Sequence, residues 1–491
     1  MKRSHVLKPI AACTRRTLLI FSTFFPPAAA ILLCDGMLNG APAASPAAPA
    51  PTNEPQGGHE SPELSVVAQL GRKMFYDPSL SGSGHLSCAS CHSPASAYGP
   101  PNDLAVQFGG RDLRKPGLRA VPSLTYIGRT PIFTIGPNSN IADYDEPPQA
   151  RVPVPGVKIA PVAKADAAAA KEAYETVPRG GLDWAGGAKA LLAEADENVP
   201  RGGLDWDGRA TTIQRQALGS LLDPNGMHNN SVAEVLDHIK RAPYAEDLRD
   251  LFGPTLFEQP VLAVNEALFA IVRYQLEEPS FHPYDSKYDA YLAGKATLSA
   301  AEARGLRLFE DPNKGNCSSC HIDKPSRDGR LPPTFTDYQF EALGAPRNQG
   351  IPANSDPNYY DLGLCGPLRK DYANTAAYCG LFRTPSLRNV ATRKVFFHNG
   401  VFHSLEEVMH FYVERETNPT KWYPKLANGE IDRYNDLPAR YKQNIDAIDA
   451  PFNRKEGDEP ALNDAEIADV IAFLKALTDG YRPEQPDGAV P

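Results

Sequence analysis

Apolar residues at helical spacing occur in two places that have similar surroundings. They recur every three or four positions over residues 64–75, and an Asp-Pro pair ends this pattern. The same spacing returns over residues 299–309, where a serine begins the pattern and a second Asp-Pro pair ends it. Further apolar helical patterns over 266–276 and 465–477 close the two halves of the chain. The spacing therefore predicts an all-α protein of two similar halves with long loops.

Residues 137–200 are predicted to be an insertion into the first half. Their first part is rich in Pro and Ala and has no helical or strand periodicity. A duplication follows, because the stretch from Val177 to Trp184 recurs from Val199 to Trp206. Only the second copy continues into Asp-Gly-Arg-Ala, so we expect Trp206 to be the functional tryptophan of the two.

The first 44 residues are predicted to be an export signal. Basic residues precede an apolar run over 17–34, and small residues follow it. Residues 45–60 are rich in Ala, Pro and Gly, which predicts a disordered linker. No other apolar run approaches the roughly 18 residues that a membrane span needs. We therefore expect a soluble periplasmic protein without a membrane span, and the net charge of −9 argues against nucleic acid as a partner.

Two copies of the sequence Cys-X-X-Cys-His carry the candidate chemistry. They consist of Cys88, Cys91 and His92 in the first half and of Cys317, Cys320 and His321 in the second. Thiols two residues apart reach the two vinyl groups of a haem, and the adjacent histidine faces the iron as its fifth ligand. A redox dithiol or a zinc site is the alternative, but histidine follows directly in both copies and no further closely spaced Cys pair completes a tetrahedral site. We therefore predict two covalently bound haem c groups.

The order of elements predicts one haem in each half. A first helix, a haem motif and a closing helix follow one another twice, which is the plan of a class I cytochrome c. The chain is long enough for two hydrophobic cores. We therefore predict an N-terminal haem domain at 61–285, which includes the insertion, a C-terminal haem domain at 286–482 and a tail at 483–491.

Two cysteines outside the signal and the haem motifs, Cys365 and Cys379, are predicted to form a disulfide. In an oxidising compartment this bond would close a loop of about 15 residues and stabilise the fold by roughly 3 kcal/mol in the chain-entropy model. Two free thiols are the alternative.

Several spaced motifs resemble the bacterial di-haem cytochrome c peroxidase and MauG superfamily. Besides the two haem motifs they are Trp206-Asp207-Gly208-Arg209-Ala210, the stretch 384–389 and Phe397-His398-Asn399-Gly400, and the resemblance covers roughly residues 61–480. It implies that hydrogen peroxide reacts at the N-terminal haem and that the C-terminal haem passes or stores electrons. Trp206 corresponds to a tryptophan between the haems, although it could be a plain core aromatic, and Gln216 to a glutamine that lines the peroxide pocket.

The first half departs from this family at two positions. Gly226 stands where the family has a glutamate that moves a proton during cleavage of the O–O bond. His228, two residues later, has a suitable pKa and is our candidate for that role, with a plain loop histidine as the alternative. Phe108 stands where some members have a displaceable histidine. We therefore expect no strong sixth protein ligand at the N-terminal haem.

The second half resembles the MauG branch at one position. The sequence from Ser404 to Glu407 is a capping box, which predicts a helix with Met409 and Tyr412 on one apolar face. Tyr412 stands where the peroxidases have a methionine ligand, so His321 and Tyr412 are the expected iron ligands. Met409 as the ligand and Tyr412 as a core tyrosine are the alternatives.

An inter-haem calcium, usual in the family, is possible here. The family supplies an asparagine side chain in a stretch that corresponds to residues 119–122, but this chain has Ala120 in its place. Backbone carbonyls alone are a weak ligand set for a cation that wants six or more oxygens.

These observations predict a periplasmic oxidoreductase that reduces hydrogen peroxide at the N-terminal haem with electrons relayed through the C-terminal haem. A small redox protein would supply the electrons, or a protein substrate would be oxidised. The alternative, motivated by Gly226, is an electron-transfer cytochrome without peroxidase chemistry, in which both irons would be six-coordinate.

Overall fold

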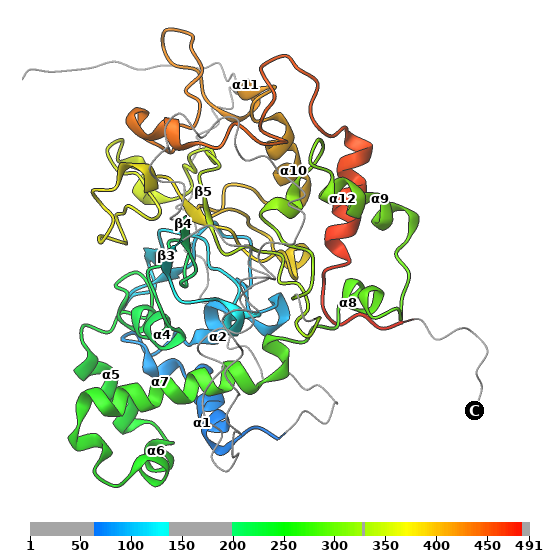
Figure 1. Cartoon of the computed structure of the whole chain (residues 1–491). Helices are drawn as coiled ribbons and strands as arrows, with labels where there is room; N and C mark the ends of the chain where they lie inside the picture. Colours follow the sequence, from blue (N-terminus) through cyan, green and yellow to red (C-terminus); the bar gives the residue numbers. More distant parts are fainter. Residues whose placement is uncertain (1–62, 137–198, 327–328, 484–491) are drawn as a thin grey trace, which may run out of the picture. The chain divides into compact units, whose positions relative to one another are not determined.

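The structure is a computed structural model, and it describes residues 63–136, 199–326 and 329–483 (Figure 1). The predicted export signal, the linker and nearly all of the predicted insertion lie outside these residues. The predicted tail is described only at its first residue.

Helix α1 (Val66–Phe75) of the first half packs against α7 (Pro260–Glu277). Gly71 lies where they cross, and a Cβ atom at this position would lie 1.8 Å from the carbonyl oxygen of Ala270. Only glycine, which has no Cβ atom, allows two backbones to approach this closely. Both helices that the apolar spacing predicts in this half are confirmed.

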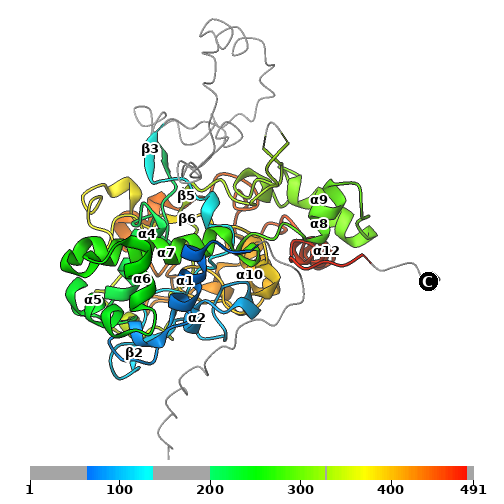
Figure 2. The same ribbon diagram turned by 90° about the horizontal axis from the view of Figure 1, so that it is seen from below.

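The second half repeats this crossing with α9 (Ala300–Glu310) and α12 (Asp464–Lys475), which lie side by side in Figures 1 and 2. Here a Cβ atom at Gly305 would lie 2.0 Å from the carbonyl oxygen of Asp469. A glycine in the first helix therefore admits the closing helix in both halves, and the two predicted helices of this half are also confirmed.

Further helices complete the described part of each half. In the first half they are α2 (Cys88–Cys91), α4 (Ile213–Leu222), α5 (Val232–Arg241) and α6 (Ala245–Phe252). In the second half they are α8 (Lys287–Leu292), α10 (Leu405–Glu414) and α11 (Pro419–Trp422). Single 3₁₀ turns are η1 (Pro78–Leu80), η2 (Pro94–Ser96), η3 (Ile127–Arg129), η7 (Leu256–Glu258), η8 (Pro279–Phe281), η9 (Cys317–Ser319), η10 (Pro352–Ser355), η11 (Ala376–Tyr378), η12 (Val390–Thr392) and η13 (Ala439–Asn444).

Three antiparallel two-stranded ladders modify the all-α prediction, so the described protein is mostly helical with a little strand. They pair β1 (Phe108–Gly109) with β2 (Lys115–Pro116), β3 (Thr134–Gly136) with β4 (Val199–Arg201), and β5 (Phe340–Glu341) with β6 (Phe382–Arg383). Because Gly136 pairs with Val199, the chain returns after residues 137–198 to the place where it left.

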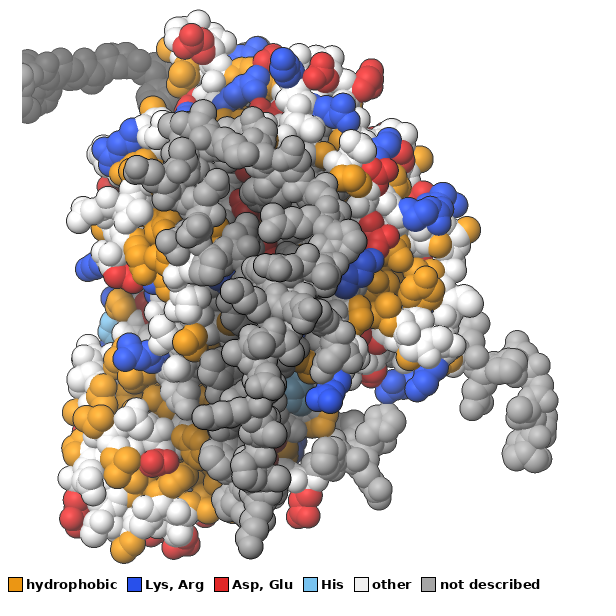
Figure 3. Space-filling model, viewed as in Figure 1, with side chains coloured by type: hydrophobic (Ala, Val, Ile, Leu, Met, Phe, Trp, Pro, Cys, Tyr) orange, Lys and Arg blue, Asp and Glu red, His pale blue; other side chains and the backbone are white. Residues whose placement is uncertain are grey.

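Two hydrophobic clusters form the core of the described residues. One takes its buried side chains from the chain between Leu70 and Phe281, and the other from the chain between Tyr288 and Leu477. On the visible surface, side chains of both charge signs lie among hydrophobic ones (Figure 3). Among the described residues, no helix combines the length and the apolar character needed to cross a membrane.

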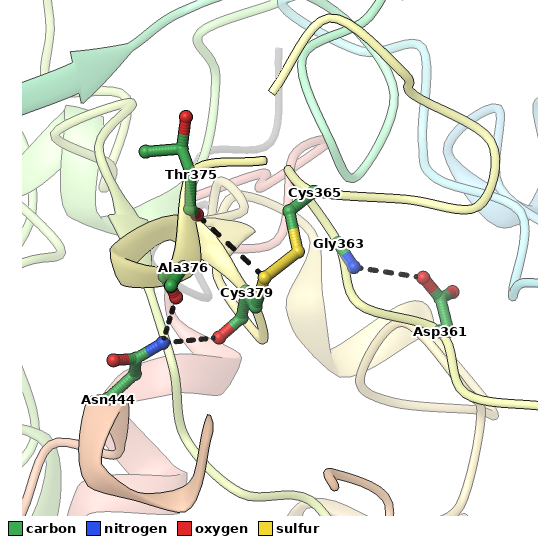
Figure 4. The surroundings of a disulfide bond; sticks show 7 residues. All are labelled: Asp361, Gly363, Cys365, Thr375, Ala376, Cys379 and Asn444. Atoms are coloured by element: carbon green, nitrogen blue, oxygen red, sulfur yellow. Dashed lines mark hydrogen bonds between the residues drawn. A yellow bond between two sulfur atoms is a disulfide. The ribbon is translucent and has the colours of Figure 1, made fainter. Parts of the chain in front are cut away.

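The predicted disulfide between Cys365 and Cys379 is confirmed (Figure 4). Asn444 supports it, because its side-chain amide donates hydrogen bonds to the carbonyl oxygens of Ala376 and Cys379, at 2.8 and 2.9 Å. The loop that the disulfide closes continues directly into β6.

Candidate haem sites

The first haem motif forms helix α2 and ends at His92. Cys88 and Cys91 are not joined to each other, so both thiols are available for a covalent bond. The Nδ1 atom of His92 lies 3.0 Å from the carbonyl oxygen of Tyr98. A carbonyl only accepts hydrogen bonds, so Nδ1 carries the proton and Nε2 keeps its lone pair. Burial lowers the pKa of His92 to about 4, which keeps the ring neutral.

The second haem motif has the same chemistry in a different local fold. Cys317 begins the turn η9, and Cys317 and Cys320 are also free thiols. The Nδ1 atom of His321 lies 2.9 Å from the carbonyl oxygen of Phe335, and burial lowers the pKa of His321 to about 4. In both motifs a backbone carbonyl thus orients a neutral imidazole and leaves Nε2 free for a metal.

A cavity of about 1180 Å³ lies beside the second motif. Cys317, Cys320 and His321 line it, together with Met409 and Tyr412 from α10. Its volume exceeds the range of roughly 300–1,000 Å³ that is usual for small-molecule sites, so it has room for a large planar cofactor.

Two arginines fit the acidic groups of such a cofactor. Arg383 and Arg393 line the cavity, and neither forms an ion pair among the described residues. Arg393 donates instead to the backbone carbonyl of Val121 at 3.1 Å, and burial lowers its pKa to about 10. A buried cation without a counter-ion is costly. The carboxylates of a haem would supply the missing negative charge, so these residues fit the cofactor that the cysteines indicate.

Helix α10 presents both candidates for the sixth ligand of the second haem. It begins at the predicted capping box, where Ser404 accepts from the backbone N–H of Glu407 and Glu407 accepts in return. Burial and the neighbouring Cys320 raise the pKa of the Tyr412 phenol. The hydroxyl group of Tyr412 makes no hydrogen bond within the described residues. Met409 lines the same cavity, so the choice between the two ligands stays a prediction.

Trp206 connects the two halves of the chain. Its indole Nε1 donates to the carbonyl oxygen of Ala120 at 2.8 Å, and its own carbonyl accepts from the backbone N–H of Arg383 at 2.8 Å. The backbone N–H of Ala120 in turn donates to the carbonyl of His398 at 2.7 Å. Trp206 also lines the cavity beside the second motif.

A buried ion cluster lies next to this tryptophan. Arg119 contacts Asp207 at 2.7 Å and Asp361 at 2.6 Å, and all three side chains are nearly inaccessible to solvent. Although burial opposes it, Asp361 and Asp207 raise the pKa of Arg119. The sequence does not predict this cluster, because its members lie far apart in the chain. The stretch 119–122 predicts only a possible calcium site, and the charge of Arg119 is the local signal for the cluster.

The remaining candidates of the first half lie in two places, Gln216 in one and His228 and Phe108 in the other. Gln216 lies on α4, lines the cavity with Trp206 and donates from Nε2 to the hydroxyl of Ser220 at 3.1 Å. His228 is half-buried, and its Nδ1 lies 2.8 Å from the carbonyl oxygen of Pro224. The backbone carbonyl of Gly226 accepts from Gly110 at 2.9 Å, which brings the segment of His228 next to the ladder that contains Phe108.

The described residues do not provide a set of acidic side chains that would bind the predicted calcium. Among them, no group of three or more His, Cys, Asp or Glu side chains is placed to hold a metal ion. The carbonyl of Ala120, one candidate ligand, already accepts from Trp206. Calcium therefore stays a prediction.

Comparison with known proteins identifies the family. Residues 65–297 match the family model described as di-haem cytochrome c peroxidase. The chain is 33% identical to the crystal structure of the diheme peroxidase BthA from Burkholderia thailandensis, with a TM-score of 0.66, and the match covers 87% of this chain and 90% of that one. The chain belongs to the di-haem cytochrome c peroxidase and MauG family. As a member, it is a peroxidase-type oxidoreductase, and the family implies two haem groups and a peroxide substrate.

Curated members of this di-haem peroxidase family extend the likeness over most of the chain. The methylamine utilization protein MauG of Paracoccus denitrificans is 26% identical over 428 residues, which are 85% of this chain and 90% of that protein. The cytochrome-c peroxidase IdrP1 of a Pseudomonas species is 24% identical over 375 residues, which are 72% of this chain and 73% of that protein. A protein named MauG and a protein named cytochrome-c peroxidase are thus similar to this chain at nearly the same identity.

Proposed function

We propose that this protein reduces hydrogen peroxide in the periplasm at an N-terminal haem held by Cys88, Cys91 and His92. In this proposal Cys317, Cys320 and His321 would hold a C-terminal haem, and Trp206 would pass electrons from the second half to the first. The two haems supply the electron transfer and the peroxide binding, and the side chains of the chain supply orientation and protons. The electrons come from a small redox protein, or a protein substrate is oxidised in its place.

The observation that carries this proposal is the position of Trp206. Its hydrogen bonds join it to Ala120 of the first half and to Arg383 of the second, and its ring shares a cavity with the second haem motif. A tryptophan held at its indole N–H and at its own backbone carbonyl is pre-organised to pass electrons between the halves. The repeated glycine crossings of α1 with α7 and of α9 with α12 support one class I cytochrome c-like domain in each half, at 61–285 and 286–482.

Reduction of one peroxide molecule consumes two protons and two electrons, so the first half must also deliver protons. Because Nδ1 of His228 donates to the carbonyl of Pro224, its Nε2 is the atom that can take up and release a proton. Gln216 uses one amide hydrogen on Ser220, which leaves its second hydrogen and its Oε1 to bind a peroxide oxygen. We assign proton transfer to His228 and substrate orientation to Gln216.

A ferric spectrum with and without peroxide tests the proposal. We expect a high-spin signal that peroxide abolishes stoichiometrically and that is missing in His92→Ala. Two low-spin haems that ignore peroxide would refute the proposal and favour the electron-transfer cytochrome that the glycine at position 226 suggests.

Trp206→Phe tests the electron relay. We expect it to slow the transfer of electrons from the second half during peroxide turnover, because the indole is replaced by a ring that is harder to oxidise. The matched control is Trp422→Phe, since Trp422 packs against Phe402 and Phe411 within the second core. Equal rates in the two variants would contradict the relay.

The sixth ligand of the second haem and the proton donor are tested by three further variants. Tyr412→Phe should change the low-spin spectrum of the second haem, whereas Met409→Leu should leave it unchanged; the opposite pattern would assign the ligand to Met409. His228→Ala should slow peroxide consumption without changing either haem spectrum, and unaltered kinetics would remove His228 from the mechanism.

A further inference from the structure

Tyr98 has an unusual position beside the first haem motif. Its carbonyl oxygen accepts the hydrogen bond of His92, and its side chain is only 1% exposed. Ala97 and Tyr98 both have left-handed backbone conformations, with φ of +49° and +53°. Such conformations are uncommon for residues other than glycine, and they persist only where the surroundings hold them. The tight turn therefore holds the carbonyl of Tyr98 against the ligand of the first haem and directs its ring into the core, where it packs on Phe75 and Phe281.

The hydroxyl group of this buried ring has a path to solvent. It lies 2.7 Å from the hydroxyl of Ser280, and Ser280 donates to the carboxylate of Glu278 at 3.0 Å. A serine has a single hydroxyl proton, which here goes to Glu278, so Tyr98 must be the donor to Ser280. Ser280 is exposed and Glu278 is half-buried. A directed chain of hydrogen bonds therefore runs from the phenol to a carboxylate at the surface.

Aromatic rings continue from Tyr98 in a second direction. Tyr98 stacks on Phe281, with ring centroids 3.6 Å apart and planes inclined by 16°. The ring of Tyr274 lies 5.4 Å from Phe281, and the half-buried ring of Tyr76 lies 6.5 Å from Tyr274. These short steps give an electron a route between the surface and Tyr98, while the serine and the glutamate give the proton a separate one.

We propose that Tyr98 is a redox-active tyrosine that drains oxidising equivalents from the first haem when neither the redox protein nor a protein substrate supplies electrons. The inference rests on the proposed reduction of peroxide at the haem held by His92. In the step, the phenol loses one electron to the peroxide-oxidised haem, its proton passes to Ser280, and the proton of Ser280 passes to Glu278. A small one-electron reductant in solvent later returns the electron through Tyr76 and Tyr274, and Glu278 returns the proton.

The burial of Tyr98 makes this coupling necessary. An oxidised phenol that kept its proton would be a buried cation without a counter-ion, which is costly. A proton acceptor within hydrogen-bond reach is therefore what allows the buried Tyr98 to give up an electron.

The test is freeze-quenched electron paramagnetic resonance of the di-haem protein after peroxide is added without a donor. We expect a tyrosyl radical signal that narrows when ring-deuterated tyrosine is incorporated and that is lost in Tyr98→Phe. The matched control is Tyr288→Phe, because Tyr288 is 2% exposed but its hydroxyl donates to the backbone carbonyl of Asp323, which cannot take the proton. The radical signal should persist in this control.

Glu278→Gln isolates the proton path without disturbing the core. A glutamine keeps an oxygen that accepts from Ser280 but takes no proton at neutral pH, so the radical signal should weaken while the haem spectrum keeps its response to peroxide. An unchanged radical signal in Tyr98→Phe, or in Glu278→Gln if the first variant does not fold, would overturn this inference alone. A native protein whose haem spectrum ignores peroxide would overturn the proposed function and this inference with it.

Discussion

Replacing Gly71 by alanine tests the crossing on which each half is built. The new Cβ atom would lie 1.8 Å from the carbonyl oxygen of Ala270, well inside van der Waals contact, and the obstacle is helix backbone that cannot rotate away. Overpacking of this kind costs about 1–3 kcal/mol. The better helix propensity of alanine returns up to about 1 kcal/mol of that cost. We therefore expect Gly71→Ala to lower the free energy of unfolding by up to about 2 kcal/mol.

The matched control is Gly219→Ala in α4, where a Cβ atom would meet nothing within 4 Å. The same substitution should there stabilise the protein by about 0.5–1 kcal/mol, because only the helix propensity changes. Denaturant unfolding of the haem-loaded protein, followed by circular dichroism, measures both. A Gly71→Ala variant as stable as Gly219→Ala would refute the inference that the glycine is needed for the crossing.

Three other substitutions give further expected outcomes. Arg119→Met removes the cation of buried Asp361 and one of the two cations that contact Asp207, the other being Arg209. It should cost about 3–5 kcal/mol, seen as a lower thermal midpoint, and an unchanged midpoint would mean that Asp361 is not charged. Joint replacement of Cys365 and Cys379 by serine should cost roughly 3 kcal/mol in denaturant unfolding, and the native protein should lose the same amount on reduction. Burial raises the pKa of Asp436 to about 7, above its value near 4 in the unfolded chain, so the folded state binds the extra proton and stability should fall as the pH rises from 4 to 7. Asp436→Asn should reduce that slope, and an identical slope in both proteins would contradict it.

The elements with a regular pattern were predictable from the sequence. The four long helices follow the apolar spacing because each buries one stripe against its partner, and the two haem motifs are contiguous in the chain. The three ladders were not predictable, because strands of two or three residues are too short to show an alternating pattern. The same limit applies at the two ends of the predicted insertion, where the short strands that pair Gly136 with Val199 show no pattern in the sequence.

The residues around the candidate site were harder to predict from the sequence. The partners of Arg119 lie 88 and 242 positions away, and no local pattern connects such residues. Arg383 ends the two-residue strand β6 and Arg393 follows the turn η12, and in such short elements the sequence suggests a solvated arginine until the fold encloses it. Tyr98 follows the haem motif closely, but its contact with Ser280 depends on how the closing helix returns to the motif.

The hydrogen bonds of His92 and His321 affect how the reduction potentials of the two haems would differ. Both imidazoles donate to a neutral peptide carbonyl, so neither acquires the partial negative charge that a carboxylate partner would confer. The electron-donating strength of the two axial ligands is therefore matched. A gap between the two reduction potentials would then come from the second ligand, the burial or the nearby charges of each haem, and engineering of the potentials should begin with those residues.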